Sequence, residues 1–276
     1  MSTPMAHELS LRLLGLYYRT RFALVRPTDF VLTGIPRSGT SLLSTLLCEP
    51  DDCFCFNEIF YDPMTLPYFL AREKKRLIRG EPVPAKMDAD GSLATDTLAG
   101  EIVVARQAFP PKRKGVVVGS NVNLPYLDRI DEILAYRYRV IALVRDPVYT
   151  LASWNSAKAQ AIPEAHVTDD DMNPRWSGMK FHSSDRVGRQ ADIWEHYARL
   201  ILDLRDQVKI VRYESLCDGQ QATMETIYEY LRVTPPAQTR ELRNMNVDSR
   251  FKGLDQIREA VAERCPSLQV LGYRCW

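Results

Sequence analysis

The feature that most constrains the fold of this chain is a set of short apolar runs that do not alternate with polar residues. Two of them cover residues 115–120 and 138–144, and a third, at 30–35, ends in Gly-Ile-Pro. Strands that are apolar on both faces must be covered on both faces, as in a parallel sheet between two layers of helices. Segments of helical character separate the runs. We therefore expect a three-layer α/β fold with a central parallel sheet.

Other segments complete this expectation. Short strands are expected at residues 53–56 and 208–211. Helices are expected at residues 40–48, 68–80, 100–109, 150–161, 190–205 and 220–233. Prolines, glycine and several aspartates predict a surface excursion at 81–96, and a similar composition predicts a long loop at 166–185.

The chain has 276 residues and no visible repeat or linker, so we expect a single domain over residues 1–276. Residues 1–28 are interpreted as an N-terminal helical segment. Arginines interrupt its apolar part, so it is not expected to span a bilayer. Packing of this helix on the domain is the main interpretation, and a role at a membrane surface is the alternative. The N-terminus lacks the pattern of a secretory signal, which predicts a cytoplasmic location.

Charge and cysteine content exclude several classes of function. The chain has 36 Lys and Arg against 35 Asp and Glu, a net charge of +1, which gives no general electrostatic case for nucleic acid or anionic membrane as the main partner. Only local patches remain. The six cysteines form no C-x-x-C pair and no histidine pair has zinc-ligand spacing, so no metal is expected. The oligomeric state is not predicted.

One glycine-containing loop, residues 34–41 (GIPRSGTS), joins the first apolar run to a predicted helix. Gly34 and Gly39 have the spacing of the phosphate-binding loop G-x-x-x-x-G-K-[ST], but Thr40 occupies the lysine position. Such a turn directs backbone N–H groups and the positive end of the helix dipole toward an anion. Without the lysine, the loop favours an anionic group shorter than a triphosphate, with Arg37 at its outer edge.

This loop resembles the one with which sulfotransferases bind the 5′-phosphosulfate of 3′-phosphoadenosine 5′-phosphosulfate (PAPS). The match is to the arginine-containing version of carbohydrate and tyrosylprotein sulfotransferases, in a soluble, bacterial-type member. The resemblance implies a sulfotransferase fold similar to that of P-loop nucleotide hydrolases, with PAPS as the donor. The loop residues that it assigns to the donor are Arg37, Ser38, Gly39, Thr40 and Ser41. A divergent ATP site, or a chance strand-turn-helix, is the alternative for the loop alone.

A second segment, residues 138–147 (YRVIALVRDP), resembles the second signature of the same family, a strand that ends in Arg-Asp-Pro. Ser153 follows Arg145 by eight positions, as that signature requires. A guanidinium and a hydroxyl so placed can converge on one phosphate. In the family this pair holds the 3′-phosphate that distinguishes PAPS from ATP. The alternative is a local ion pair between Arg145 and Asp146, with Ser153 an ordinary helix residue.

Two weaker similarities follow. Residues 211–216 resemble the family's strand that ends in Tyr-Glu, which implies that Tyr213 lies near the nucleotide. Arg250, Lys252 and Gly253 resemble the late basic loop that closes over the 3′-phosphate, although the commoner form has Arg-Lys directly before the glycine. Simple solvation of this charged loop is the alternative. The resemblance spans residues 30 to about 253.

Sulfuryl transfer needs charge stabilisation and a proton acceptor. Arg37 is predicted to neutralise the leaving phosphate. No histidine lies between the two signatures, where the cytosolic small-molecule enzymes have their base. Glu58 is the candidate instead, because it follows the strand at 53–56 as a glutamate does in tyrosylprotein sulfotransferases, and parallel strands end at the same rim of a sheet. A structural role for Glu58, as a turn cap or paired with an arginine, is the alternative; the reserve bases are Asn57, His166 and His182.

The acceptor is the least constrained part of the prediction. Segments 60–100 and 160–190 are expected to build its pocket, with aromatic walls from Tyr61, Tyr68, Trp176 and Phe181. The run Asp169-Asp170-Asp171 favours a cationic acceptor if it faces that pocket. We expect a soluble small molecule that offers a hydroxyl or an amine or amide nitrogen, a cationic natural product being one candidate. The rival functions are a magnesium-dependent P-loop kinase of nucleotides or small molecules, and a non-catalytic nucleotide-binding protein.

Overall fold

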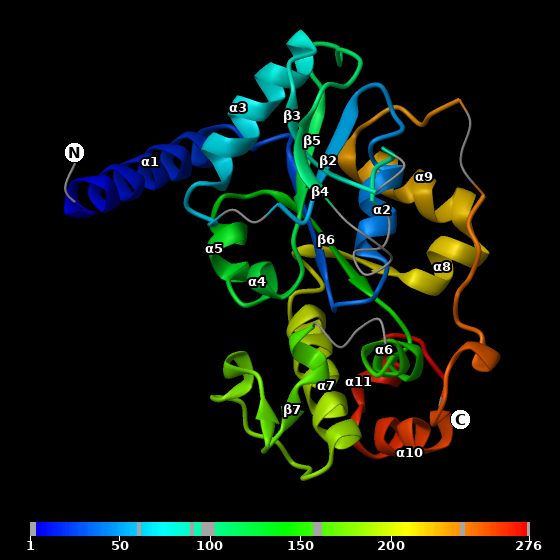
Figure 1. Ribbon diagram of the computed structural model, residues 1–276. Helices are drawn as coiled ribbons and strands as arrows, with labels where there is room; N and C mark the ends of the chain where they lie inside the picture. The colour runs from blue at the N-terminus through cyan, green and yellow to red at the C-terminus, as the bar shows by residue number, and fades with distance from the viewer. Residues whose placement is uncertain are drawn as a thin grey trace. The chain divides into compact units, whose positions relative to one another are not determined.

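A five-stranded parallel sheet with flanking helices forms the centre of the structure, as the apolar runs predict (Figure 1). The computed structural model describes residues 4–59, 62–88, 91–94, 103–156, 162–237 and 241–274. The strand order is β2-β5-β1-β6-β9. The strands are β1 (Phe30–Gly34), β2 (Cys53–Asn57), β5 (Val117–Asn121), β6 (Arg139–Val144) and β9 (Val208–Arg212). Every residue of β1, β2, β5 and β6 is buried, so these strands are covered on both faces, as their apolar character requires.

Contacts divide the chain into two compact units. The first comprises Met1–Gly34, Thr40–Ile141 and Gln221–Glu241. The second comprises Ile35–Gly39, Ala142–Gln220 and Leu242–Trp276. The glycine-containing loop therefore enters the second unit after Gly34 and returns to the first at the Gly39–Thr40 peptide bond.

In the first unit β5 pairs in parallel with both β1 and β2. Gly119 of β5 lies opposite Phe30 and Cys55, and a Cβ atom at this glycine would lie 2.2 Å from the Phe30 ring. The close approach explains why a glycine interrupts a strand of valines. Figure 1 shows α2 and α9 on one side of these strands and α3, α4 and α5 on the other. The helices are α1 (Pro4–Leu24), α2 (Thr40–Leu46), α3 (Leu66–Arg79), α4 (Leu124–Leu127), α5 (Ile130–Ala135) and α9 (Gln220–Leu231).

An antiparallel hairpin in the first unit corrects the sequence prediction. β3 (Val83–Met87) pairs with β4 (Val103–Gln107), so the helix expected at 100–109 is wrong, and the excursion at 81–96 contains a strand. Valines at 103 and 104 fit a pleated strand better than a helix, and β3 supplies the hydrogen-bonding partner. Val83 and Ala85 are buried, so this hairpin also adds to the core.

The second unit is built around α7 (Arg186–Asp203). It packs against α6 (Pro147–Trp154), α10 (Leu254–Arg264) and α11 (Ser267–Val270), and its Trp194 is fully buried. α8 (Tyr213–Asp218) follows β9 directly. The segment expected as a long loop contains the short hairpin β7 (Val167–Thr168) and β8 (Asp171–Met172). Short 3₁₀ helices cover Pro163–Ala165, Pro174–Trp176 and Asp248–Arg250.

Within the part of the chain that the structure describes, no helix is long and apolar enough to cross a membrane.

Candidate active site

The residues of the glycine-containing loop that belong to the second unit, Ile35–Gly39, are held to neighbouring elements of that unit. The N–H of Ile35 donates to the carbonyl of Leu143 in β6 (3.1 Å), and the indole N–H of Trp154 in α6 donates to the carbonyl of Pro36 (3.2 Å). The backbone of Arg37 is left-handed, with a φ of 69°. A non-glycine residue in this region is uncommon and is found disproportionately at functional sites.

Ser38 carries a buried hydroxyl that has no hydrogen-bond partner among the described residues. The residue is fully buried, 0% exposed. Buried hydroxyls in native proteins are nearly always satisfied, so this one is available to an atom of a ligand or of a water molecule. The sequence prediction placed Ser38 among the donor-binding residues.

Arg145, at the C-terminal end of β6, is a buried cation whose hydrogen-bond acceptors are neutral. Its Nε donates to Oδ1 of Asn246 (2.7 Å) and its Nη1 donates to the carbonyl of Arg37 (3.0 Å). Its guanidinium lies 4.8 Å from the centre of the Tyr213 ring. Burial lowers the pKa of Arg145 because it removes water from the charged form. The charges of Glu214 and Asp146 partly offset this effect. Because the hydrogen bonds described above go to neutral oxygens, the position can also hold a bound anion.

Ser153 lies where the second signature predicts, on α6 and beside the loop. Its buried Oγ accepts a hydrogen bond from Nε of Arg37 at 3.0 Å. Arg37 therefore contacts Ser153 through its side chain and Arg145 through its carbonyl. The structure brings these three predicted residues together within the second unit.

Asp146 caps α6. Its Oδ1 accepts a hydrogen bond from the N–H of Val148 (2.8 Å), as an N-cap aspartate does. Burial raises the pKa of Asp146 to about 6. The carboxylate is therefore used by the helix terminus, whereas a local ion pair with Arg145 was the alternative considered from the sequence.

Tyr213 closes the other side of the loop. A Cβ atom at Gly39, whose φ is +90°, would lie 2.7 Å from Cδ2 of Tyr213, so only glycine allows this approach. In contrast, Arg250, Lys252 and Gly253 are exposed, and the Arg250 guanidinium contacts the sulfur of Met245. A role in donor binding for these three residues stays a prediction.

Sequence reasoning missed Asn246, which stands behind Arg145 and links it to Glu214 of the Tyr-Glu segment. Nδ2 of Asn246 donates to Oε1 of Glu214 (2.7 Å), so the amide bridges a cation and a carboxylate. Glu214 also accepts hydrogen bonds from the N–H of Asp146 (3.0 Å) and the hydroxyl of Tyr273 (3.0 Å). This network fixes the edge of the guanidinium that faces Asn246. No motif marks position 246, so only the folded loop reveals it.

Glu164 is a second residue that the sequence did not indicate. Its carboxyl group is buried in the second unit, and burial raises its pKa to about 7, against the opposing effects of its own N–H and of Arg175 and Arg37. A carboxyl group with this pKa exchanges its proton near neutral pH.

Replacing Glu164 with glutamine is expected to raise the melting temperature at about pH 8 and to change it much less at about pH 5. An acid whose pKa is higher in the folded state takes up a proton more readily when folded, so stability increases as the pH falls from about 7 toward 4.5. The glutamine variant lacks this dependence, which is of the order of 1 to 3 kcal/mol. Thermal unfolding at both pH values measures it, and an equal difference at both would show that burial of the charge is not the cause.

Glu58 lies in the first unit, directly after β2. Its Oε1 accepts a hydrogen bond from Ser41 Oγ (3.3 Å), and its Oε2 forms an ion pair with Lys86 of β3. The backbone is again left-handed, with a φ of 50°. The side chain is 24% exposed. Glu58 thus contacts a predicted donor-binding residue, and the pairing considered as its structural alternative is also present, with a lysine.

Neighbouring polar groups in the first unit are mostly satisfied internally. Asn57 is buried, and its Oδ1 accepts a hydrogen bond from Nδ2 of Asn121 (2.7 Å). Thr40 Oγ1 donates to Oδ1 of Asn123 (2.9 Å). The Oδ1 atom of Asn121 is buried without a partner among the described residues. Asn57 is therefore held in place by a neighbouring side chain, and its role as a reserve base stays a prediction.

The residues predicted to form the acceptor pocket lie in different environments in the structure. Tyr61 lies outside the described residues. Tyr68 is exposed, Trp176 is buried with its N–H donated to the carbonyl of Pro163 (2.9 Å), and Phe181 lies 5.3 Å from the Arg189 guanidinium. In the aspartate run, Asp169 pairs with Arg189 (2.6 Å), and Asp171 pairs with the reserve base His166 (2.7 Å).

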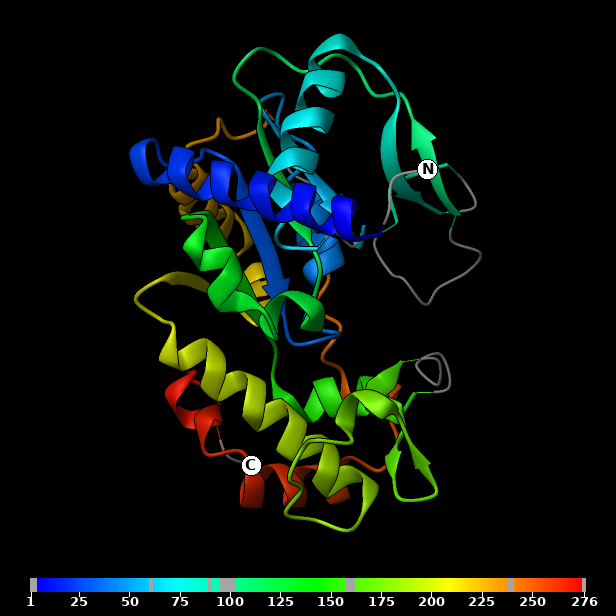
Figure 2. The same ribbon diagram turned by 90° about the vertical axis from the view of Figure 1, so that its left-hand side faces the viewer.

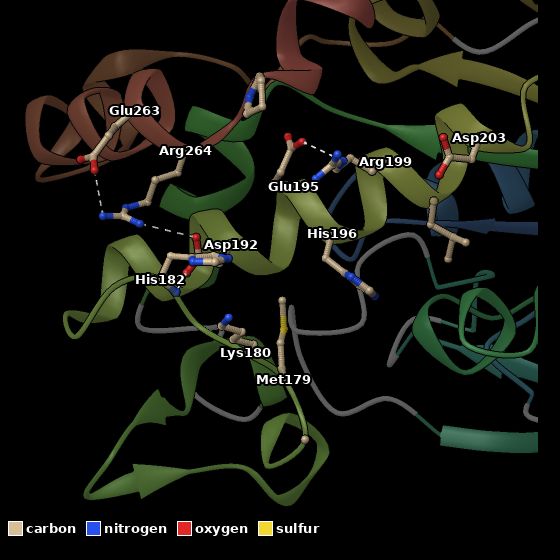
Figure 3. Close-up of a pocket in the computed structure, with 13 residues that line it drawn as sticks. Met179, Lys180, His182, Asp192, Glu195, His196, Arg199, Asp203, Glu263 and Arg264 are labelled. Carbon is tan, nitrogen blue, oxygen red and sulfur yellow. Dashed lines mark hydrogen bonds and ion pairs between the residues drawn. The ribbon is translucent and has the colours of Figure 1, made fainter.

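A cavity of about 770 Å³ lies along α7 in the second unit (Figure 3). Met179, Lys180 and His182 line one side, and His196 and Arg199 project from α7. Two of the acidic groups are paired, with Arg264 at 3.7 Å from Asp192 and Arg199 at 3.8 Å from Glu195. The lining includes the reserve base His182 and none of the predicted donor-binding residues. Among the described residues no group of three or more His, Cys, Asp and Glu side chains could hold a metal ion.

Comparison with known proteins identifies the family to which the chain belongs. A family model described as Sulfotransferase family matches residues 29–236. The sulfotransferase domain from the curacin biosynthetic pathway is similar over 91% of this chain and 99% of that chain, with a TM-score of 0.50 and 14% identity. A sulfotransferase from Alicyclobacillus acidocaldarius is similar over 90% and 96%, with a TM-score of 0.47 and 17% identity. No curated protein matches the sequence significantly.

Proposed function

We propose, since the chain belongs to the Sulfotransferase family, that it transfers a sulfuryl group from PAPS to a hydroxyl or to an amine or amide nitrogen of a soluble small molecule. The observation that carries the donor assignment is Arg145, a buried cation bonded to neutral acceptors beside the loop. ATP lacks the 3′-phosphate that this arginine is proposed to bind.

The residues of the second unit fit such a donor. The unsatisfied hydroxyl of Ser38 and the guanidinium of Arg37 would bind the 5′-phosphosulfate. Arg145 and Ser153 would hold the 3′-phosphate, and Tyr213 would lie near the nucleotide. When bound, the donor supplies the sulfuryl group and a phosphate leaving group.

Arg37 and Glu58 are proposed to do the chemistry. Arg37 neutralises negative charge on the leaving phosphate, with its Nε oriented by Ser153. Glu58 accepts the proton that the acceptor loses, and Ser41 and Lys86 define where its two oxygens lie. No metal is required, since the sulfuryl group carries less charge than a terminal phosphate.

The acceptor is proposed to be a small metabolite, with segments 60–100 and 160–190 as the source of specificity. The ion pairs of Asp169 and Asp171 weaken the case for a cationic acceptor, because these carboxylates already have partners. A P-loop kinase is the rival enzyme, and the absence of a lysine at position 40 opposes it.

A thermal-shift titration tests the donor. At about one hundred times its dissociation constant, 3′-phosphoadenosine 5′-phosphate is expected to add about 2.7 kcal/mol, or about 5 to 10 °C in melting temperature. Adenosine 5′-phosphate at the same concentration should shift it less. A shift with magnesium ATP and none with the 3′-phosphate compound would show that the kinase reading is correct.

A further inference from the structure

α1 presents an apolar stripe to solvent that the core does not use. Leu13, Leu16, Tyr17 and Leu24 are 59%, 63%, 56% and 83% exposed, and we call these four side chains the outer face. Their spacing of three, four and seven residues places them on one side of the helix. Single exposed leucines are ordinary, but four large apolar side chains on one side of a helix, here with Thr20 among them, are typical of an interaction site.

The opposite side of α1 holds the helix to the first unit. The ring of Phe22 lies 5.8 Å from that of Tyr138 and 6.5 Å from that of Tyr136, and Tyr18 is buried. Arg137 donates to the carbonyl of Ala23 at the end of the helix (2.8 Å). Figure 2 shows α1 running across α3, with one long side toward the viewer. The contacts that hold α1 to the first unit therefore leave the outer face exposed.

Arginines flank the outer face on both sides. At about 100° per residue, Arg19 lies about 60° to one side of Leu16, and Arg21 lies about 40° beyond Tyr17 on the other. Both residues are exposed, and the Arg19 guanidinium also lies 5.3 Å from the centre of the Tyr136 ring. The sequence has no acidic residue between positions 9 and 28, so the stripe and its flanks carry only positive charge.

We propose that the outer face of α1 binds an anionic lipid surface, with the leucines in the acyl boundary and the arginines among the headgroups. A helix that lies in a membrane interface has this pattern of an apolar stripe and flanking cations, with an aromatic residue at headgroup level. Each basic residue near such a surface strengthens binding, and the charge is local, so the balanced net charge of the chain does not oppose it.

A second copy of the chain fits the outer face less well. Two identical helices paired through these stripes would bring Arg19 and Arg21 of one near those of the other, with no acidic side chain from positions 9–28 to pair with them. Anionic headgroups supply that missing charge.

Co-sedimentation of the full chain with vesicles tests the proposal. Binding is expected with phosphatidylcholine containing about one third phosphatidylglycerol, with little binding to phosphatidylcholine alone, and it should weaken as salt rises from about 0.1 to 0.5 M. Leu16→Ser with Leu24→Ser should reduce the partition coefficient about ten-fold or more. Arg19→Gln with Arg21→Gln should reduce it about ten-fold on anionic vesicles.

The matched control is Val270→Ser on α11, which removes an apolar side chain that is 64% exposed in the second unit and should leave binding unchanged. Circular dichroism confirms that each variant is folded. Absence of binding to anionic vesicles, or equal binding by the double leucine variant, overturns the proposal. A concentration-dependent dimer in light scattering that the leucine variant abolishes, without vesicle binding, assigns the face to a second copy instead.

Discussion

Replacing Glu58 with glutamine is expected to lower kcat by roughly 10²-fold or more, while 3′-phosphoadenosine 5′-phosphate still binds with nearly unchanged affinity. Glutamine retains the size of the side chain and can still accept a hydrogen bond from Ser41, but it cannot take a proton from the acceptor. The rate is measured as nucleotide released from PAPS with a panel of phenols and primary amines as acceptors.

The control for this experiment is Glu81→Gln. Glu81 lies in the same unit and also pairs with a cation, Arg79 (3.4 Å), at a more exposed position, so its replacement should leave kcat unchanged. Near-normal turnover in the Glu58 variant would refute the catalytic assignment. A lower melting temperature without loss of turnover would show that Glu58 and Lys86 form a structural pair only.

Replacing Arg145 with alanine is expected to weaken binding of 3′-phosphoadenosine 5′-phosphate by roughly 10- to 100-fold or more, and of adenosine 5′-phosphate much less. A hydrogen bond to a charged group contributes about 1.5 to 3 kcal/mol, and only the first ligand has the phosphate that Arg145 is proposed to bind. Isothermal titration calorimetry with both nucleotides gives the difference directly. Equal losses for the two nucleotides would mean that Arg145 organises the loop and does not contact the 3′-phosphate.

Two further variants test how much the neighbours of Arg145 and the exposed basic loop contribute to binding of the 3′-phosphate. Asn246→Ala removes the acceptor for Arg145 Nε but leaves the guanidinium in place, so a smaller loss, about five- to ten-fold, is expected. Arg250→Ala combined with Lys252→Ala tests the exposed basic loop that the family resemblance assigns to the same phosphate. Measurable loss in that double variant would show that the loop moves onto the nucleotide when it binds.

Four strands of the central sheet were predictable because their own residues are mostly apolar on both faces, whereas β9 contains Lys209 and is only partly buried. Apolar runs such as 140–144 indicate strands that are covered on both faces, and the structure buries every residue of β6. The hairpin of β3 and β4 was not predictable in the same way. Val103 and its neighbours become a strand because β3, some 20 positions earlier, supplies hydrogen bonds, and a window on 100–109 does not contain that partner.

The candidate site likewise contains residues that a local motif predicts and residues whose role depends on distant parts of the chain. Motif spacing was sufficient to propose Arg37, Arg145 and Ser153, and the structure joins them by two hydrogen bonds. Their supporting residues were not predictable, since Asn246 acts from a loop about 100 positions away, and its role depends on where that loop lies. Lys86 was hidden for a related reason, because it meets Glu58 only through the unexpected hairpin.

The left-handed backbones of Arg37 and Glu58 place thermal stability and activity in conflict at these two positions. Glycine adopts this conformation without the steric cost of a Cβ atom, which is of the order of 1 kcal/mol or more for other residues. A library selected only for survival of heating would therefore tend to gather glycine at positions 37 and 58. Variants selected in this way would lose the two side chains proposed for the chemistry. Thermostabilisation of this protein therefore needs a screen that reports turnover as well as folding.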